Sequence, residues 1–106
     1  MKLDHTPGPW KSVNCGNHWN NPYLERYEIH YGNDGECIAD TVYRPEDARL
    51  IAAAPDMLDH IIQDAADELS NDYWSNKPFD DWKKGRSRLV KIIERATGMK
   101  IEEVLE

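Results

Sequence analysis

The chain has 106 residues, enough for one hydrophobic core, and its hydrophobic content of 40% excludes a disordered chain. Its formal net charge of −7 argues against sequence-independent binding to nucleic acid or to anionic membrane surfaces, which both need cationic protein surface. The longest apolar run, at residues 50–54, is far shorter than the roughly 20 residues that cross a bilayer, so we expect a cytoplasmic protein outside the membrane.

The first 44 residues are predicted to be rich in β-structure. Residues 10–13 form a plausible first strand, and residues 14–22 are so dense in turn-forming side chains that we expect a loop there. In residues 23–31 apolar and polar side chains alternate, which is typical of a half-buried strand. Residues 32–35, Gly-Asn-Asp-Gly, predict a hairpin turn, and residues 36–43 are then the returning strand.

The pattern changes to helical spacing after residue 45. Apolar side chains recur every three or four positions up to residue 69, as on one face of an amphipathic helix. Pro55 lies inside this stretch and removes one helical hydrogen bond. We therefore expect either a kink at Pro55 or two helices, at about residues 46–54 and 55–70.

A last long helix is predicted over residues 79–97, ended by Gly98, with a short turn at residues 100–106. Together these elements predict an α+β fold, in which a small antiparallel sheet of about three strands is followed by two or three helices packed on one of its faces. We expect residues 1–106 to form a single domain, β-rich over residues 1–44 and helical over residues 45–106.

Charge is distributed unevenly between the predicted helices. Residues 46–72 contain eight acids and one base, whereas residues 83–100 contain seven bases and one acid. The simplest interpretation is that two antiparallel helices lie close together with their charges paired. The pattern leaves open whether they pair within one chain or between the chains of a homodimer. In the alternative interpretation, the basic helix binds an acidic partner or nucleic acid.

Two segments together resemble a known group of proteins. HTPGPW at residues 5–10 and ARLIAAAPDML at residues 48–58 occur in this order, with Gly-x-x-Ile-Ala at residues 35–39 between them. This combination resembles a widespread family of small uncharacterised phage and prophage proteins, over roughly residues 5–60. The resemblance implies a phage or prophage origin and carries over no catalytic or binding residue.

Few residues suggest chemistry. Cys15 and His18 have the spacing of one half of a zinc site, which Cys37, His5 or His30 could complete, but a second spaced pair is missing. The sequence also lacks a nucleophile elbow, a phosphate-binding glycine loop and a redox Cys-x-x-Cys pair. We therefore predict no catalytic residue, no cofactor and no enzyme, with a metal- or nucleotide-dependent enzyme as the alternative.

Exposed aromatic and acidic side chains are the stronger candidates for contact with a partner. Aromatic residues in turn-rich segments are expected to be exposed, and such residues are enriched at binding hot spots. Acidic side chains beside the apolar stripe of the first helix form a solvated face. The predicted protein-binding residues are Trp19, Tyr23, Trp74, Asp56, Asp59 and Asp67.

A phage origin favours one class of function. Small acidic phage proteins often act by occupying a host protein, including components of defence systems, although this argument is by association. We therefore predict a non-catalytic module in the host cytoplasm that binds a host or phage protein, and inhibition of a host defence protein is one form of that activity. Binding of nucleic acid by the basic C-terminal helix is the remaining alternative.

Overall fold

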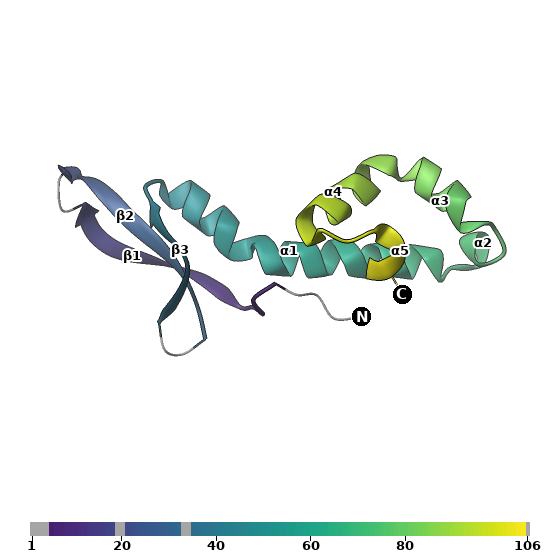
Figure 1. Ribbon diagram of the computed structural model, residues 1–106, viewed down its shortest axis with the longest axis horizontal. Helices are drawn as coiled ribbons and strands as arrows, with labels where there is room; N and C mark the ends of the chain where they lie inside the picture. Colours follow the sequence, from purple (N-terminus) through teal and green to yellow (C-terminus); the bar gives the residue numbers. More distant parts are fainter. Residues whose placement is uncertain (1–4, 19–20, 33–34, 106) are drawn as a thin grey trace. The chain divides into compact units, whose positions relative to one another are not determined.

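The computed structural model describes residues 5–18, 21–32 and 35–105 and has the predicted α+β fold, in which a three-stranded sheet precedes the helices along the chain (Figure 1). None of the described helices combines the length and the apolar character needed to span a bilayer. The elements are β1 (Trp10–His18), β2 (Asn21–Tyr31), β3 (Glu36–Val42), α1 (Pro45–Leu69), α2 (Asp72–Ser75), α3 (Phe79–Gly85), α4 (Ser87–Thr97) and α5 (Ile101–Val104).

Contacts between residues divide the chain into two compact units. We call residues Thr6–Met57 the sheet unit and residues 58–105 the helical unit, so that α1 contributes its first half to one and its second half to the other. The expectation of a single domain with a boundary near residue 44 stays a prediction.

The sheet is antiparallel with the strand order β1-β2-β3. The loop predicted at residues 14–22 was wrong in extent, because β1 continues to His18 and β2 begins at Asn21. Several of the turn-forming residues lie in a β-bulge of β1 instead. Asn14 pairs with Tyr27 and Asn17 with Glu25, so three steps along β1 match two along β2.

Gly16 makes this bulge sterically inexpensive. Its φ of 87° lies in the left-handed region, and its backbone N–H donates to the Asn14 side-chain oxygen at 2.8 Å. The local turn preference of these residues is therefore satisfied inside a continuous strand.

The first helix runs through Pro55 without a break, so the alternative of two separate helices was wrong. Its N-terminus is as expected, with Pro45 at the first position and Glu46 and Asp47 in the first turn, where negative charge meets the helix dipole. Pro55 is buried, and a Cβ atom at Gly8 would lie only 3.4 Å from its ring. Burial of the ring helps to offset the hydrogen bond that proline cannot make.

The helical unit has its own hydrophobic core. Trp82 and Ile93 are fully buried at its centre. The predicted helix over residues 79–97 is divided into α3 and α4, since Arg86 has non-helical backbone angles (φ −125°, ψ 32°). Gly98 ends α4 as predicted, in a left-handed conformation. The buried members of the core are Ala65, Trp82, Val90, Ile93, Ile101 and Val104.

Candidate functional site

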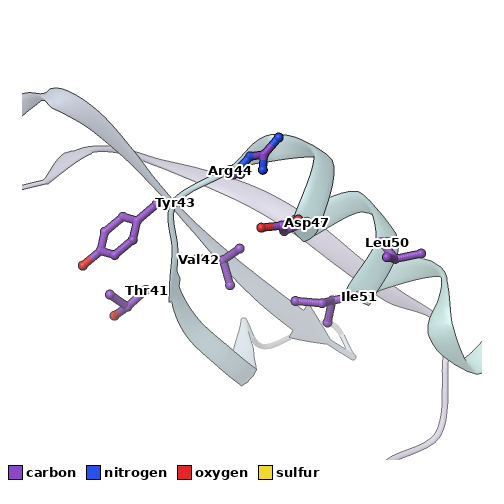
Figure 2. Close-up of a pocket in the computed structure, with 7 residues that line it drawn as sticks. All are labelled: Thr41, Val42, Tyr43, Arg44, Asp47, Leu50 and Ile51. Atoms are coloured by element: carbon purple, nitrogen blue, oxygen red, sulfur yellow. The ribbon is translucent and has the colours of Figure 1, made fainter.

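A groove lies in the sheet unit where the end of β3 leads into the first turns of α1 (Figure 2). It has a volume of about 610 Å³ and is open to solvent. Strand, connection and helix all contribute to its lining, which is formed by Thr41, Val42, Tyr43, Arg44, Asp47, Leu50 and Ile51.

The groove owes its shape to a second β-bulge. Tyr27 pairs with Val42 and Ile29 with Ala39, so two steps along β2 match three along β3. The extra residue is accommodated at Thr41, which has a φ of 59°, a rare value for a β-branched residue. A bulge of this kind redirects the end of a strand, and here the chain continues directly into α1.

The lining of the groove offers apolar surface to a partner. Leu50 is 61% exposed and Tyr43 is 38% exposed, whereas Val42 and Ile51 are half-buried beside them. Arg44 and Asp47 add one charge of each sign. The seven lining side chains contain no histidine and no cysteine.

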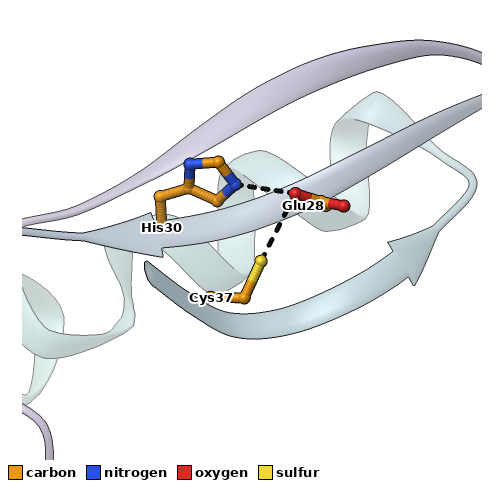
Figure 3. A group of neighbouring side chains, drawn as sticks. All are labelled: Glu28, His30 and Cys37. Carbon is orange, nitrogen blue, oxygen red and sulfur yellow. Dashed lines mark hydrogen bonds and ion pairs between the residues drawn. The ribbon is translucent and has the colours of Figure 1, made fainter. Parts of the chain in front are cut away.

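A second feature of the sheet unit is a polar cluster that we define by Glu28, His30 and Cys37 (Figure 3). Glu28 Oε1 lies 2.8 Å from His30 Nε2 and accepts a hydrogen bond from Cys37 Sγ at 3.3 Å. The second carboxylate oxygen accepts from Arg26 at 2.6 Å. Glu28 is thus the centre of the cluster, with its side chain only 20% exposed.

The hydrogen bonds of Glu28 control its ionisation. Those from His30, Arg26 and Cys37 lower the pKa of its carboxyl group to about 2, against the opposing effect of burial. Burial and the neighbouring carboxylate both raise the pKa of the Cys37 thiol, and the pKa of the Cys15 thiol is raised for the same reasons. Glu28 is therefore a carboxylate at neutral pH, and both nearby thiols are protonated.

Comparison with known proteins places the chain among phage proteins. A family model described as Salmonella phage P22 protein Y8K6 matches residues 1–100. The chain belongs to this phage protein family. No curated protein and no solved structure matches it. Membership of the Y8K6 family agrees with the resemblance to small phage proteins found in the sequence.

The aromatic residues predicted to bind a partner have different surroundings in this member of the Y8K6 family. Tyr23, on β2, is 96% exposed. Trp74 is half-buried against the core of the helical unit, and its neighbour Tyr73 is the more exposed ring at 64%. Trp19 lies outside the described residues.

The acidic candidates lie on α1 as expected. Asp56, Asp59 and Asp67 are all exposed, and Asp67 accepts a hydrogen bond from the Gln63 side chain at 2.9 Å. They lie on both sides of the boundary between the units, because Asp56 belongs to the sheet unit and the other two to the helical unit.

The weak metal candidates lie on β1 of the sheet unit. Cys15 is at the first bulge, close enough to Glu28 for the carboxylate to affect its pKa. The side chain of His18 lies outside the described part of the structure. The cysteine is thus next to a polar cluster whose histidine is His30.

Two basic residues of the predicted basic helix form ion pairs inside the helical unit. Arg86 lies 2.9 Å from Glu68, and Lys83 lies 2.5 Å from Glu102. Each pair reduces the positive charge available to nucleic acid. The first pair joins the last turn of α1 to the residue before α4, and the antiparallel arrangement of the two charged helices stays a prediction.

Sequence reasoning missed Tyr43 and Leu50 at the groove and Glu28 in the polar cluster. Leu50 was assigned to the buried stripe of α1, because helical spacing alone does not show where the covering element ends. Glu28 and His30 did carry a signal, since alternation placed both on one face of the strand.

Proposed function

We propose that this Y8K6-family protein is a non-catalytic protein-binding module that acts in the cytoplasm of the host cell. The groove of the sheet unit is the contact surface, and its occupant is a segment of a host or phage protein that carries an apolar anchor side chain. The observation that carries this proposal is the exposure of Leu50 and Tyr43 beside half-buried apolar neighbours.

The composition of the groove supports a peptide-like occupant. Exposed tyrosine beside exposed aliphatic surface is typical of binding hot spots, where burial of the ring and exclusion of water stabilise the complex. β3 is also an outer strand of the sheet formed by the described residues, so its edge can pair with an extended partner segment. Membership of a phage family supports a host or phage protein as the partner.

Affinity purification followed by binding measurements tests the groove. Wild type, Leu50→Asp and Tyr43→Ala are used to capture proteins from host lysate, and the Kd of the purified partner is then measured by calorimetry. We expect each variant to weaken binding by more than about tenfold, because truncation at a hot spot costs about 2 kcal/mol or more.

The matched control is Ile92→Asp, an exposed aliphatic position in the helical unit whose exposure of 45% lies between those of Tyr43 and Leu50. It should leave the Kd unchanged. Wild-type affinity in both groove variants would remove the groove from the contact surface, and an equal loss in Ile92→Asp would show that the helical unit is involved.

A further inference from the structure

The polar cluster of the sheet unit brings together three different metal-ligating side chains. One potential ligand atom from each of Glu28, His30 and Cys37 lies within 4.8 Å of the other two. We propose that these three side chains bind a zinc ion through Glu28 Oε1, His30 Nε2 and Cys37 Sγ. The site is separate from the groove and does not depend on the proposed protein-binding function.

The backbone brings the ligands together by alternation and by a bulge. Glu28 and His30 are two residues apart on β2 and therefore share one face of the sheet. Cys37 comes from β3 and lies directly opposite His30, so its side chain is on the same face. In Figure 3 the imidazole of His30 and the thiol of Cys37 are both directed toward the carboxylate of Glu28, where the two dashed lines meet.

This face is opposite to the one on which Ile29 is fully buried. Tyr27 lies on that other face, and the charges of Arg49 and Glu46 on α1 affect the pKa of its hydroxyl group. Residues of alternate number on β2, such as Glu28 and His30, point in the opposite direction. Cys37 is exposed, so an ion from solvent can reach the cluster.

The ligand types and their spacing suit zinc. Thiolate, imidazole and carboxylate are its three usual protein ligands, at about 2.3, 2.0 and 2.1 Å. Tetrahedral geometry then separates the nitrogen and oxygen ligands by about 3.3 Å and the sulfur and oxygen ligands by about 3.6 Å. The observed nitrogen–oxygen and sulfur–oxygen separations are 2.8 and 3.3 Å, so each of these two pairs must move apart by about half an ångström or less to admit the ion, while His30 Nε2 and Cys37 Sγ lie within 4.8 Å of each other.

The contacts of Glu28 leave the correct oxygen available. Arg26 donates to Oε2, which fixes the carboxylate and directs Oε1 toward His30 and Cys37. In the metal-free chain, hydrogen bonds connect the His30 imidazole and the Cys37 thiol to Glu28. Zinc would replace the hydrogen bonds with coordination bonds and release the thiol proton, and its two positive charges would balance one carboxylate and one thiolate.

Titration of the full-length chain with zinc tests the site. Protein freed of tag and of metal is kept reduced and titrated with Zn²⁺ by calorimetry, and with Co²⁺ to detect the absorption band of a cobalt–thiolate bond. We expect one ion per chain and a cobalt–thiolate band. Cys37→Ala and His30→Ala should each weaken zinc binding by about 100-fold or more, because even groups that only orient ligands contribute roughly 10–100-fold.

Three controls make the result decisive. His60→Ala removes an exposed histidine beside Asp64 in the helical unit and should bind zinc as wild type does. Circular dichroism without metal checks the fold of each variant, and His30→Gln takes the place of His30→Ala if that variant fails to fold, because the histidine must be tested as well as the exposed Cys37. Cys15→Ala tests the neighbouring thiol. If Cys15→Ala loses zinc binding as Cys37→Ala and His30→Ala do, Cys15 is a fourth ligand and the site is supported.

Three outcomes would overturn the proposal. They are absence of zinc binding by the wild type, wild-type binding by Cys37→Ala, and a site that needs Cys15 and Cys37 but not His30. The last would show a two-thiol site in place of the mixed one proposed here.

Discussion

The carboxylate of Glu68 connects the last turn of α1 to Trp82 on α3 and to Arg86, between α3 and α4. Its Oε1 atom accepts from the indole N–H of Trp82 at 2.7 Å and lies 2.9 Å from the Arg86 guanidinium. Partial burial tends to raise the pKa of Glu68, but the bonds from Arg86 and Trp82 outweigh it and hold the pKa below its ordinary value of 4.5. The charged form is thus favoured by folding.

The stability of the protein should therefore depend on the ionisation of Glu68. A pKa depressed in the folded state adds stability above pH 4.5, and that contribution is lost as the pH falls through the folded pKa. At pH 7 we expect Glu68→Gln to cost about 1 kcal/mol, since hydrogen bonds to a charged group are stronger than those to a neutral one.

Urea unfolding at pH 7 and at several values below 4.5 measures this effect. The difference between wild type and Glu68→Gln should shrink as the pH falls. Asp56→Asn, an exposed change on the same helix, serves as the control for general charge effects. A difference that stays constant with pH would contradict the role assigned to Glu68.

At the scale of elements, the ends of helices and the bulges of strands determine where side chains lie. α4 ends at Gly98, which has a φ of 70° and donates its N–H to the Glu94 carbonyl. A residue with a Cβ atom is strained in this conformation. Gly85, at the end of α3, has no such backbone angle, and a Cβ atom there would meet no atom within 4 Å.

We expect Gly98→Ala to lower the free energy of unfolding by about 1 kcal/mol. Gly85→Ala should instead leave it unchanged or raise it by roughly 0.4–1 kcal/mol, because alanine restricts the unfolded chain and favours helix. Chemical denaturation of both variants provides the comparison. Equal effects of the two substitutions would show that the left-handed conformation at Gly98 contributes nothing.

For the whole molecule, the main difference between the units is the amount of buried apolar surface. Among the described residues, the helical unit buries six hydrophobic side chains, Trp82 included, in one core. Among the described side chains of the sheet unit, those that are buried are Ile29, Ala48 and Pro55. Regions with fewer buried contacts open at a lower free energy.

Amide hydrogen exchange should reveal this difference. We expect the slowest-exchanging amides in α4 and in the second half of α1, and faster exchange in β1 and β3. Trp82→Ala should accelerate exchange in α4 strongly, since loss of a buried tryptophan costs roughly 3–5 kcal/mol. Slower exchange in the strands than in α4 of the wild type would contradict the proposed distribution of stability.

The sequence by itself determined the features that depend on neighbours along the chain. Alternation identified β2, the Gly-Asn-Asp-Gly segment predicted a hairpin turn and with it the returning strand β3, and helical spacing with Pro45 identified α1. Gly98 was recognised as a helix end because left-handed backbone favours glycine. Each of these inferences rests on interactions within a few residues, and the sequence contains all of that information.

Only the tertiary structure decided the features that depend on pairing between segments. Residues 14–18 and 21–22 of the predicted loop are strand, and a bulge at Cys15 and Gly16 accommodates turn formers of β1. Cys37 would fall on the same face as Ala39 in a regular strand, but an irregularity in register places it opposite His30. Alternation is read one strand at a time, whereas register is set by two strands together. The groove and the polar cluster therefore became visible only in the folded protein.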